Sequence, residues 1–197
     1  MRAFEPLFPS FIEDILSREH ETGVEESCPV AGCKGVATVR CRECRQRAPL
    51  CKSHAVDAHR HLPFHWIEVW NGRYFVRQGL HSLGFVIDLG HNGAPCPERS
   101  TSSRPYDFTI VHDNGVHHVK IRDCHCADHL PFINQLVRAD FFPATATQPE
   151  TAFTREALRG FIVDFEISKK SAQDYVRRLV RNSEGEEGKP VKVRMAM

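Results

Sequence analysis

The sequence predicts a small α+β fold that is rich in metal ligands, and three observations support this class. Residues 28–65 are dense in cysteine and histidine and lack the apolar periodicity of a self-supporting core. Residues 66–122 favour strands and include a strong hairpin signal, whereas residues 130–181 carry apolar residues at helical spacing. We therefore expect a cysteine-rich module, then an antiparallel hairpin-rich sheet, then C-terminal helices.

The first predicted elements are short. Residues 11–16 favour an amphipathic helix, within an N-terminal helical segment that spans residues 1–24. Strand-type residues follow at 66–70, 74–76 and 85–87, and Asn71-Gly72 predicts a turn between the first two. Residues 92–106 contain three prolines and a run of serine and threonine, which predicts a loop.

The clearest local signal is a hairpin. Residues 107–113 and 116–122 alternate in polarity and flank Asn114-Gly115, a dipeptide that favours a tight two-residue turn. Such a turn pairs Ile110 with Val119 and Phe108 with Ile121, which places apolar residues on one face.

Three helices are predicted after the hairpin, at residues 130–139, 151–165 and 171–181. Residues 182–197 are too polar to pack, so we expect a mobile tail there. The predicted domains are therefore the segment 1–24, a two-metal module at 25–66, a sheet with helices at 67–181, and the tail.

Composition and charge narrow the class of protein. Of the 197 residues, 41% are apolar and 26% are charged, as is ordinary for a soluble protein. No apolar run approaches the roughly 20 residues that a membrane helix needs, and the acidic start does not resemble a secretory signal. Eight cysteines without such a signal predict a reducing, intracellular compartment, where thiols bind metal more often than they form disulfides.

The charge is uneven although the formal net charge is only +1. Residues 1–27 hold seven acids and two bases, whereas residues 34–60 hold seven bases and two acids. The basic stretch runs through the cysteines and offers candidate phosphate contacts for nucleic acid, and the alternative is a plain solvated basic surface. The candidates are Arg40, Arg42, Arg45, Arg47, Lys52 and Arg60.

The first group of ligand-type residues comes in four successive pairs. Zinc prefers four thiolate or imidazole ligands in a tetrahedron, and short loops supply two at a time. The cross-braced arrangement of B-box-like fingers places Cys28, Cys33, Cys51 and His54 on one ion, and Cys41, Cys44, His59 and His65 on a second. His61 competes for a place in the second set, and the spacing leaves this choice open. The other interpretation is a set of free buried thiols and surface histidines.

The second group is sparser. His91 and Cys96 lie in the predicted loop, and Cys124-x-Cys126 follows the hairpin. Two close pairs of ligand-type residues predict a third zinc, with His125 pointing away because neighbours on an extended chain alternate. Buried free thiols are the alternative. We thus expect three zinc ions per chain.

The sequence lacks the motifs of a zinc enzyme. It contains no His-Glu-x-x-His and no deaminase signature. Sets of four protein ligands also leave no open position for a reactive water. We therefore expect that the chain is not an enzyme.

An ordered set of short motifs carries a family resemblance from about residue 11 to about residue 181. These motifs are His59-x5-His65, Trp70-Asn71-Gly72-x-Tyr74-Phe75, Leu83-Gly84-Phe85, Leu89-Gly90-His91, Cys96, Asp113-Asn114-Gly115-x-His117, Cys124-x-Cys126, Gln135-Leu136, Phe142-Pro143-Ala144-Thr145 and Pro149-x-Thr151-Ala152. Together they resemble the CxC-type cysteine cluster domain associated with Kyakuja–Dileera–Zisupton (KDZ) transposases of fungi.

The resemblance implies a nuclear, zinc-binding accessory domain of a DNA transposition system. The family's catalytic core, a ribonuclease-H-like domain, would lie downstream and is not expected in this chain. DNA or chromatin recognition is the favoured role. The alternative is a zinc-dependent protein–protein interaction module that docks the transposase core or a host factor.

Overall fold

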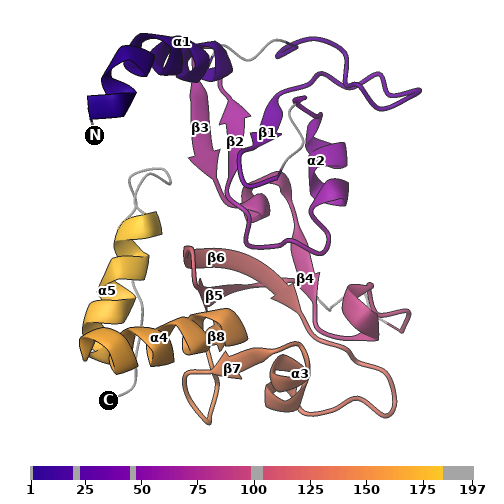
Figure 1. Cartoon of the computed structure of the whole chain (residues 1–197). Helices are drawn as coiled ribbons and strands as arrows, with labels where there is room; N and C mark the ends of the chain where they lie inside the picture. Colours follow the sequence, from indigo (N-terminus) through magenta and orange to yellow (C-terminus); the bar gives the residue numbers. More distant parts are fainter. Residues whose placement is uncertain (1, 20–22, 45–47, 99–103, 184–197) are drawn as a thin grey trace.

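The computed structural model describes residues 2–19, 23–44, 48–98 and 104–183. Within these ranges it contains five α-helices and two β-sheets, which confirms the predicted α+β class (Figure 1). In Figure 1 the three-stranded sheet lies in the upper half of the molecule and the five-stranded sheet in the lower half, and α1 lies beside the upper end of the smaller sheet. The 3₁₀-helix Arg2–Leu7 leads into α1, Phe8–Glu19, which is longer than the predicted helix at 11–16.

The small sheet has the order β1-β2-β3 and is antiparallel throughout. Its strands are β1 (Val39–Cys41), β2 (Ile67–Trp70) and β3 (Phe75–Gln78), and α2 (Lys52–Ala58) lies in the chain between the first two. Val39, Ile67 and Leu80 are almost fully buried at its centre. The predicted turn at Asn71-Gly72 is present, because the Asn71 side chain accepts hydrogen bonds from the backbone of Arg73 and Tyr74.

The large sheet has the order β4-β6-β5-β8-β7. Its strands are β4 (Val86–Asp88), β5 (Tyr106–His112), β6 (Gly115–Arg122), β7 (Phe141–Pro143) and β8 (Thr151–Thr154). The β5–β6 and β7–β8 pairs are antiparallel, whereas β4–β6 and β5–β8 are parallel. Its buried core includes Ile110, Ile121 and Leu136, the last from α3 (Phe132–Arg138).

The predicted register of the hairpin is wrong by two residues. Phe108 lies opposite Val119 and Ile110 lies opposite His117, because Asp113-Asn114 forms the turn and Gly115 pairs with His112. Gly115 has φ 153°, and a Cβ atom there would lie 2.8 Å from the Ser183 Oγ. Because Ser183 and Trp66 approach the backbone this closely, the position favours glycine over residues with a side chain. A shift of two keeps every residue on its predicted face.

The predicted helix at 151–165 is wrong at its start. Residues 151–154 form β8, of which residues 151–153 pair with β5, and α4 begins at Arg155 and ends at Ser168. The Thr154 Oγ1 accepts a hydrogen bond from the Ala157 N–H and caps this helix. The last helix, α5 (Ala172–Ser183), includes the first two residues of the predicted tail, and residues 184–197 lie outside the described residues.

The two sheets contact each other through the segment that joins α2 to β2. Phe64 belongs to the apolar core of the large sheet, whereas Ile67 belongs to that of the small sheet. Strands on both sides of residue 66 also share the small sheet. The predicted division into a module at 25–66 and a sheet with helices at 67–181 therefore stays a prediction.

Candidate metal centres

The structure brings the ligand-type residues together in the three predicted sets. In each set, the four candidate ligand atoms lie within 4.8 Å of one another. All eight cysteines belong to these sets, and none forms a disulfide. His61 is exposed and lies outside the second set, and His125 is likewise exposed and outside the third. The sets are called clusters one, two and three below, in chain order.

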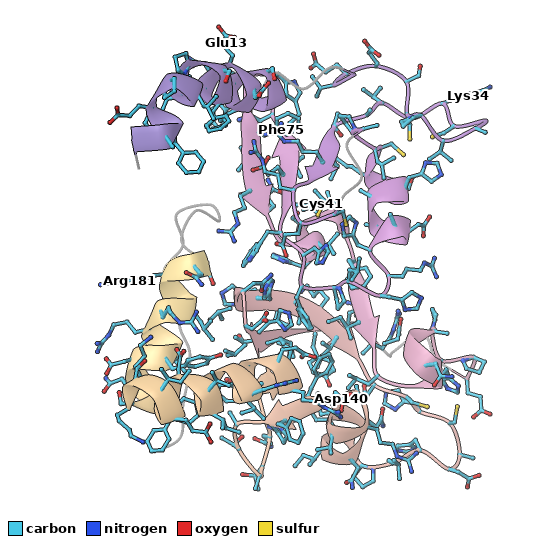
Figure 2. The ribbon with its side chains drawn as sticks, viewed as in Figure 1. Glu13, Lys34, Cys41, Phe75, Asp140 and Arg181 are labelled. Carbon is cyan, nitrogen blue, oxygen red and sulfur yellow. The ribbon has the colours of Figure 1, made fainter. Side chains whose placement is uncertain are left out.

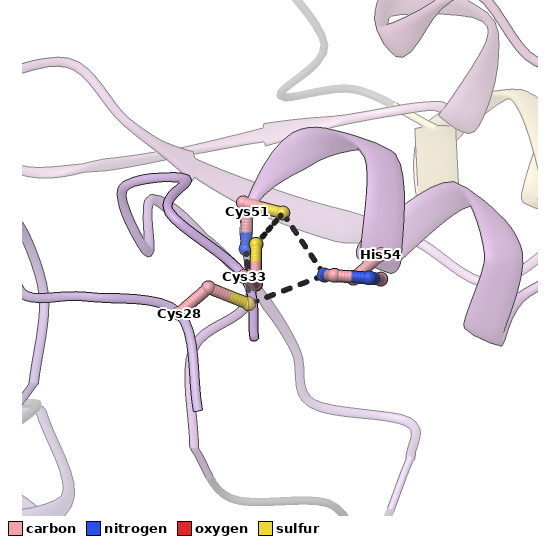
Figure 3. A group of neighbouring side chains, drawn as sticks. All are labelled: Cys28, Cys33, Cys51 and His54. Atoms are coloured by element: carbon pink, nitrogen blue, oxygen red, sulfur yellow. Dashed lines mark hydrogen bonds between the residues drawn. The ribbon is translucent and has the colours of Figure 1, made fainter. Parts of the chain in front are cut away.

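Cluster one joins a loop to the start of α2 (Figure 3). Cys28 and Cys33 come from the loop, whereas Cys51 is the N-cap residue of α2 and His54 lies in its first turn. The His54 Nδ1 lies 3.4 Å from the Cys28 Sγ and 3.3 Å from the Cys51 Sγ. The Ser53 hydroxyl, 3.3 Å from the same sulfur, is the main influence that lowers the pKa of Cys51 to about 6. A thiolate, the form that binds metal, is therefore accessible at neutral pH.

Cluster two lies between the two sheets, as the position of Cys41 shows (Figure 2). Cys41 ends β1, and His59 is the C-cap residue of α2. The Cys44 Sγ lies 3.4 Å from the His59 Nε2 and 3.3 Å from the His65 Nδ1. The His59 Nδ1 donates a hydrogen bond to the Ala55 carbonyl at 2.7 Å, so its Nε2 presents a lone pair to the cluster. Burial and then the charge of Cys41 raise the pKa of Cys44 to about 11.

Cluster three lies beside the carboxyl end of β6. The His91 Nε2 is 3.3 Å from the sulfurs of both Cys124 and Cys126, and the Cys96 Sγ is 3.8 Å and 3.5 Å from the same two sulfurs. The backbone N–H of His125 is the main influence that lowers the pKa of Cys96 to about 6. The neighbouring Cys124 side chain, followed by that of Cys96, raises the pKa of Cys126 to about 12.

The distances within the clusters match a tetrahedral metal site. With metal–sulfur bonds of about 2.3 Å and metal–nitrogen bonds of about 2.0–2.1 Å, a tetrahedron has sulfur–sulfur edges of about 3.8 Å and sulfur–nitrogen edges of about 3.6 Å. Among the closest ligand pairs, the sulfur–sulfur distances are 3.5–3.8 Å and the sulfur–nitrogen distances are 3.3–3.6 Å. Thiols packed this closely also cannot all ionise without a compensating cation. The clusters can therefore hold metal ions.

Two glycines allow the backbone to approach these sulfurs. A Cβ atom on Gly35 would lie 2.9 Å from the Cys51 Cβ, and one on Gly90 would lie 2.8 Å from the Cys124 Cβ. Neither contact is possible for a larger residue without displacing a candidate ligand. The sequence contains both glycines, but their role depends on contacts between distant segments and could not be deduced from spacing.

Acidic side chains form ion pairs with three of the arginines that were predicted to contact phosphate. Arg40 is buried, and both its Nε and the Arg42 Nε donate to the same Glu68 oxygen, at 2.6 Å and 3.0 Å. Arg60 forms an ion pair with Asp57 at 2.9 Å. Lys52 is exposed at the start of α2, whereas Arg45 and Arg47 lie outside the described residues. The charge count missed Glu68 because its position beside Arg40 depends on the β1–β2 register.

Comparison with known protein families shows that the larger part of the chain matches one family model. The family model described as "CxC2 like cysteine cluster associated with KDZ transposases" matches residues 80–187, more than half of the sequence. The chain belongs to the CxC2 family. This confirms the resemblance found in the sequence. The matched segment contains cluster three and the five-stranded sheet, whereas clusters one and two lie before it.

No curated protein and no solved structure matches the CxC2 chain. Among its described residues, no helix combines the length and the apolar character needed to cross a bilayer.

Proposed function

We propose that the chain is a zinc-dependent accessory module that works beside a KDZ-type transposase in the nucleus and has no catalytic role of its own. The spacing of the ligand atoms carries this proposal, since in all three clusters these atoms lie within 4.8 Å of one another and the closest pairs match the edges of a tetrahedral zinc site. Cysteine and histidine in a tetrahedral set of four favour zinc over metals that prefer oxygen ligands or octahedral geometry. Bound zinc would crosslink distant segments, and four protein ligands leave no position for a reactive water.

Native mass spectrometry tests the metal content. The protein purified without added chelator is expected to carry three zinc ions, and Cys33→Ser is expected to lower the count by one. His61→Ala is the matched control, because His61 lies between His59 and His65 in the sequence but outside every cluster. A parent protein with one zinc or none would refute the zinc scaffold.

We further infer that the module docks onto the catalytic domain of the transposase, because its N-terminal helix offers an apolar surface. Phe8, Phe11, Ile12, Ile15 and Leu16 of α1 are between 42% and 61% exposed. Glu13 points away from the body of the molecule, so the helix combines apolar and acidic side chains (Figure 2). An amphipathic helix of this kind fits a groove on a partner protein. DNA recognition is the weaker candidate, since Arg40, Arg42 and Arg60 already have acidic partners.

Size-exclusion chromatography with a purified KDZ transposase catalytic domain tests the docking. Phe11→Ser together with Ile15→Ser is expected to weaken the complex about a hundredfold or more, since each buried apolar side chain contributes about 1.5–3 kcal/mol. Ser17→Ala, on the same helix, is the control. If instead the parent shifts duplex DNA in a salt-dependent way and ignores the catalytic domain, DNA recognition replaces docking.

A further inference from the structure

The residues on either side of His65 fix cluster two to the large sheet. His65 faces Cys41 and Cys44, whereas its neighbours Phe64 and Trp66 face the β5–β6 hairpin and are only 8% and 5% exposed. The Phe64 ring lies in the apolar core of the large sheet. The Trp66 ring stacks on that of His117, with 4.2 Å between ring centroids. Any displacement of His65 would therefore move two side chains that are buried against the other half of the molecule.

Asn114, in the hairpin turn, holds this segment through several hydrogen bonds. Its side-chain Nδ2 donates to the Phe64 backbone carbonyl at 2.8 Å. Its backbone carbonyl accepts from the Trp66 Nε1 at 3.4 Å. Its Oδ1 accepts from the His117 Nε2 at 2.8 Å, which orients the amide group. One turn residue thus contacts both neighbours of a candidate ligand.

Glu43 extends this network into the cysteine loop of cluster two. It lies between Cys41 and Cys44, and its Oε1 accepts a hydrogen bond from the Trp66 backbone N–H at 2.8 Å. Its other oxygen accepts from the Asn114 Nδ2 at 3.3 Å. The cysteine pair and His65 are therefore held relative to each other by two residues that are not ligands.

We propose that Glu43 and Asn114 are positioning residues that couple metal binding at cluster two to the placement of the large sheet. A metal ion at this cluster fixes the cysteine loop and His65, and these place the hairpin through Glu43 and Asn114. Coupling of binding free energies is reciprocal, so the hairpin contact in turn strengthens metal retention at cluster two. Clusters one and three have no such contact with Asn114 among the described residues. The inference rests on the proposed zinc binding.

Zinc release measures the coupling directly. The zinc-loaded full chain is exposed to a chromophoric chelator while N-ethylmaleimide labels each cysteine as it is freed, and peptide mass spectrometry identifies the cluster. Asn114→Ala is expected to speed release from cluster two by about 10–100-fold, the usual effect of removing such a supporting residue. Release from clusters one and three should stay at the parent rate. Asp113→Ala is the matched control, because Asp113 is in the same turn but pairs with His112.

A second variant covers the case in which Asn114→Ala disturbs the turn itself. Glu43→Gln keeps the shape of the side chain but replaces one acceptor by an N–H group, which then faces the donor of Asn114 or of Trp66. It is expected to speed release from cluster two alone. If both variants carry three zinc ions and release them all at parent rates, the coupling is refuted and the zinc scaffold stands. A parent without zinc would refute both proposals.

Discussion

The Gln135 side chain forms two hydrogen bonds with the backbone of Cys124. The Cys124 N–H donates to the Gln135 Oε1 at 2.7 Å, and the Gln135 Nε2 donates back to the Cys124 carbonyl at 3.1 Å. The same Nε2 also donates to the Leu130 carbonyl at 2.7 Å. The buried amide of α3 thus fixes the backbone from which one candidate ligand of cluster three projects.

Gln135→Ala should therefore weaken metal binding at cluster three. The change leaves the Cys124 N–H and carbonyl without these partners, and loss of a supporting residue of this kind costs about 10–100-fold in metal affinity. Competition with a chelator, followed by native mass spectrometry, measures the effect. Asn134→Ala, its exposed neighbour, should behave like the parent.

Gly35→Ala and Gly90→Ala should each release one metal ion, from different clusters. The added methyl group would lie 2.9 Å from the Cys51 Cβ in the first variant and 2.8 Å from the Cys124 Cβ in the second. Because a Cβ atom cannot rotate away, the backbone must separate and the ligands with it. Cysteine alkylation should label cluster one in Gly35→Ala and cluster three in Gly90→Ala. Each variant is the control for the other, and equal labelling of all clusters in both would contradict the prediction.

Loss of a whole ligand should have larger effects on stability. Structural zinc contributes about 10–16 kcal/mol of apparent binding energy in small fingers, which exceeds the net stability of about 5–15 kcal/mol of most domains. Cys44→Ser should unfold the small-sheet region, and Cys124→Ser should mainly damage the large sheet. Limited proteolysis with peptide mapping distinguishes the two patterns. Both variants melting like the parent would mean that the cysteines are not ligands.

Acid should destabilise the protein through His117. Burial and then the charge of His112 hold the pKa of His117 well below its usual value, so the folded state keeps the ring neutral. In the unfolded chain the ring titrates near pH 6.5, so the unfolded state binds the proton more readily below that pH. The contribution is complete above about pH 6.5 and is lost as the pH falls from there toward the folded pKa.

Thermal melts at pH 7.5 and 5.5 measure this contribution. His117→Gln should reduce the drop in melting temperature by about 3–6 °C, since one such group contributes up to about 1.4 kcal/mol at pH 5.5. Both proteins are compared with zinc in excess, because acid also protonates the thiols in each. An equal drop in both would contradict the role of His117.

Local patterns predicted much of this fold, and distant contacts decided the rest. Ligand spacing grouped the twelve cysteine and histidine residues as the structure groups them, because short loops force such pairs together. The turn signal predicted Asn114-Gly115 at the hairpin tip, but Asp113-Asn114 forms the turn and Gly115 lies in the strand, where Trp66 and Ser183 approach it closely.

Two further features also depend on contacts between distant segments, which local patterns cannot predict. Residues 151–154 precede a helical pattern and were expected to join it, but pairing with β5 places them in the sheet. The pairing of β1 with β2 likewise sets Glu68 beside Arg40, a relationship that a count of charges along the chain cannot reveal. In both cases the deciding partner lies more than 25 residues away in the sequence.

The short helix α2 restricts how related sequences can differ in length. Cys51, at one end, belongs to cluster one, and His59, at the other, belongs to cluster two. A single inserted residue would turn His59 by about 100° around the helix axis relative to Cys51 and shift it by about 1.5 Å. Insertions and deletions should therefore be rare between Cys51 and His59 in relatives that keep both clusters, even where the surrounding loops vary freely.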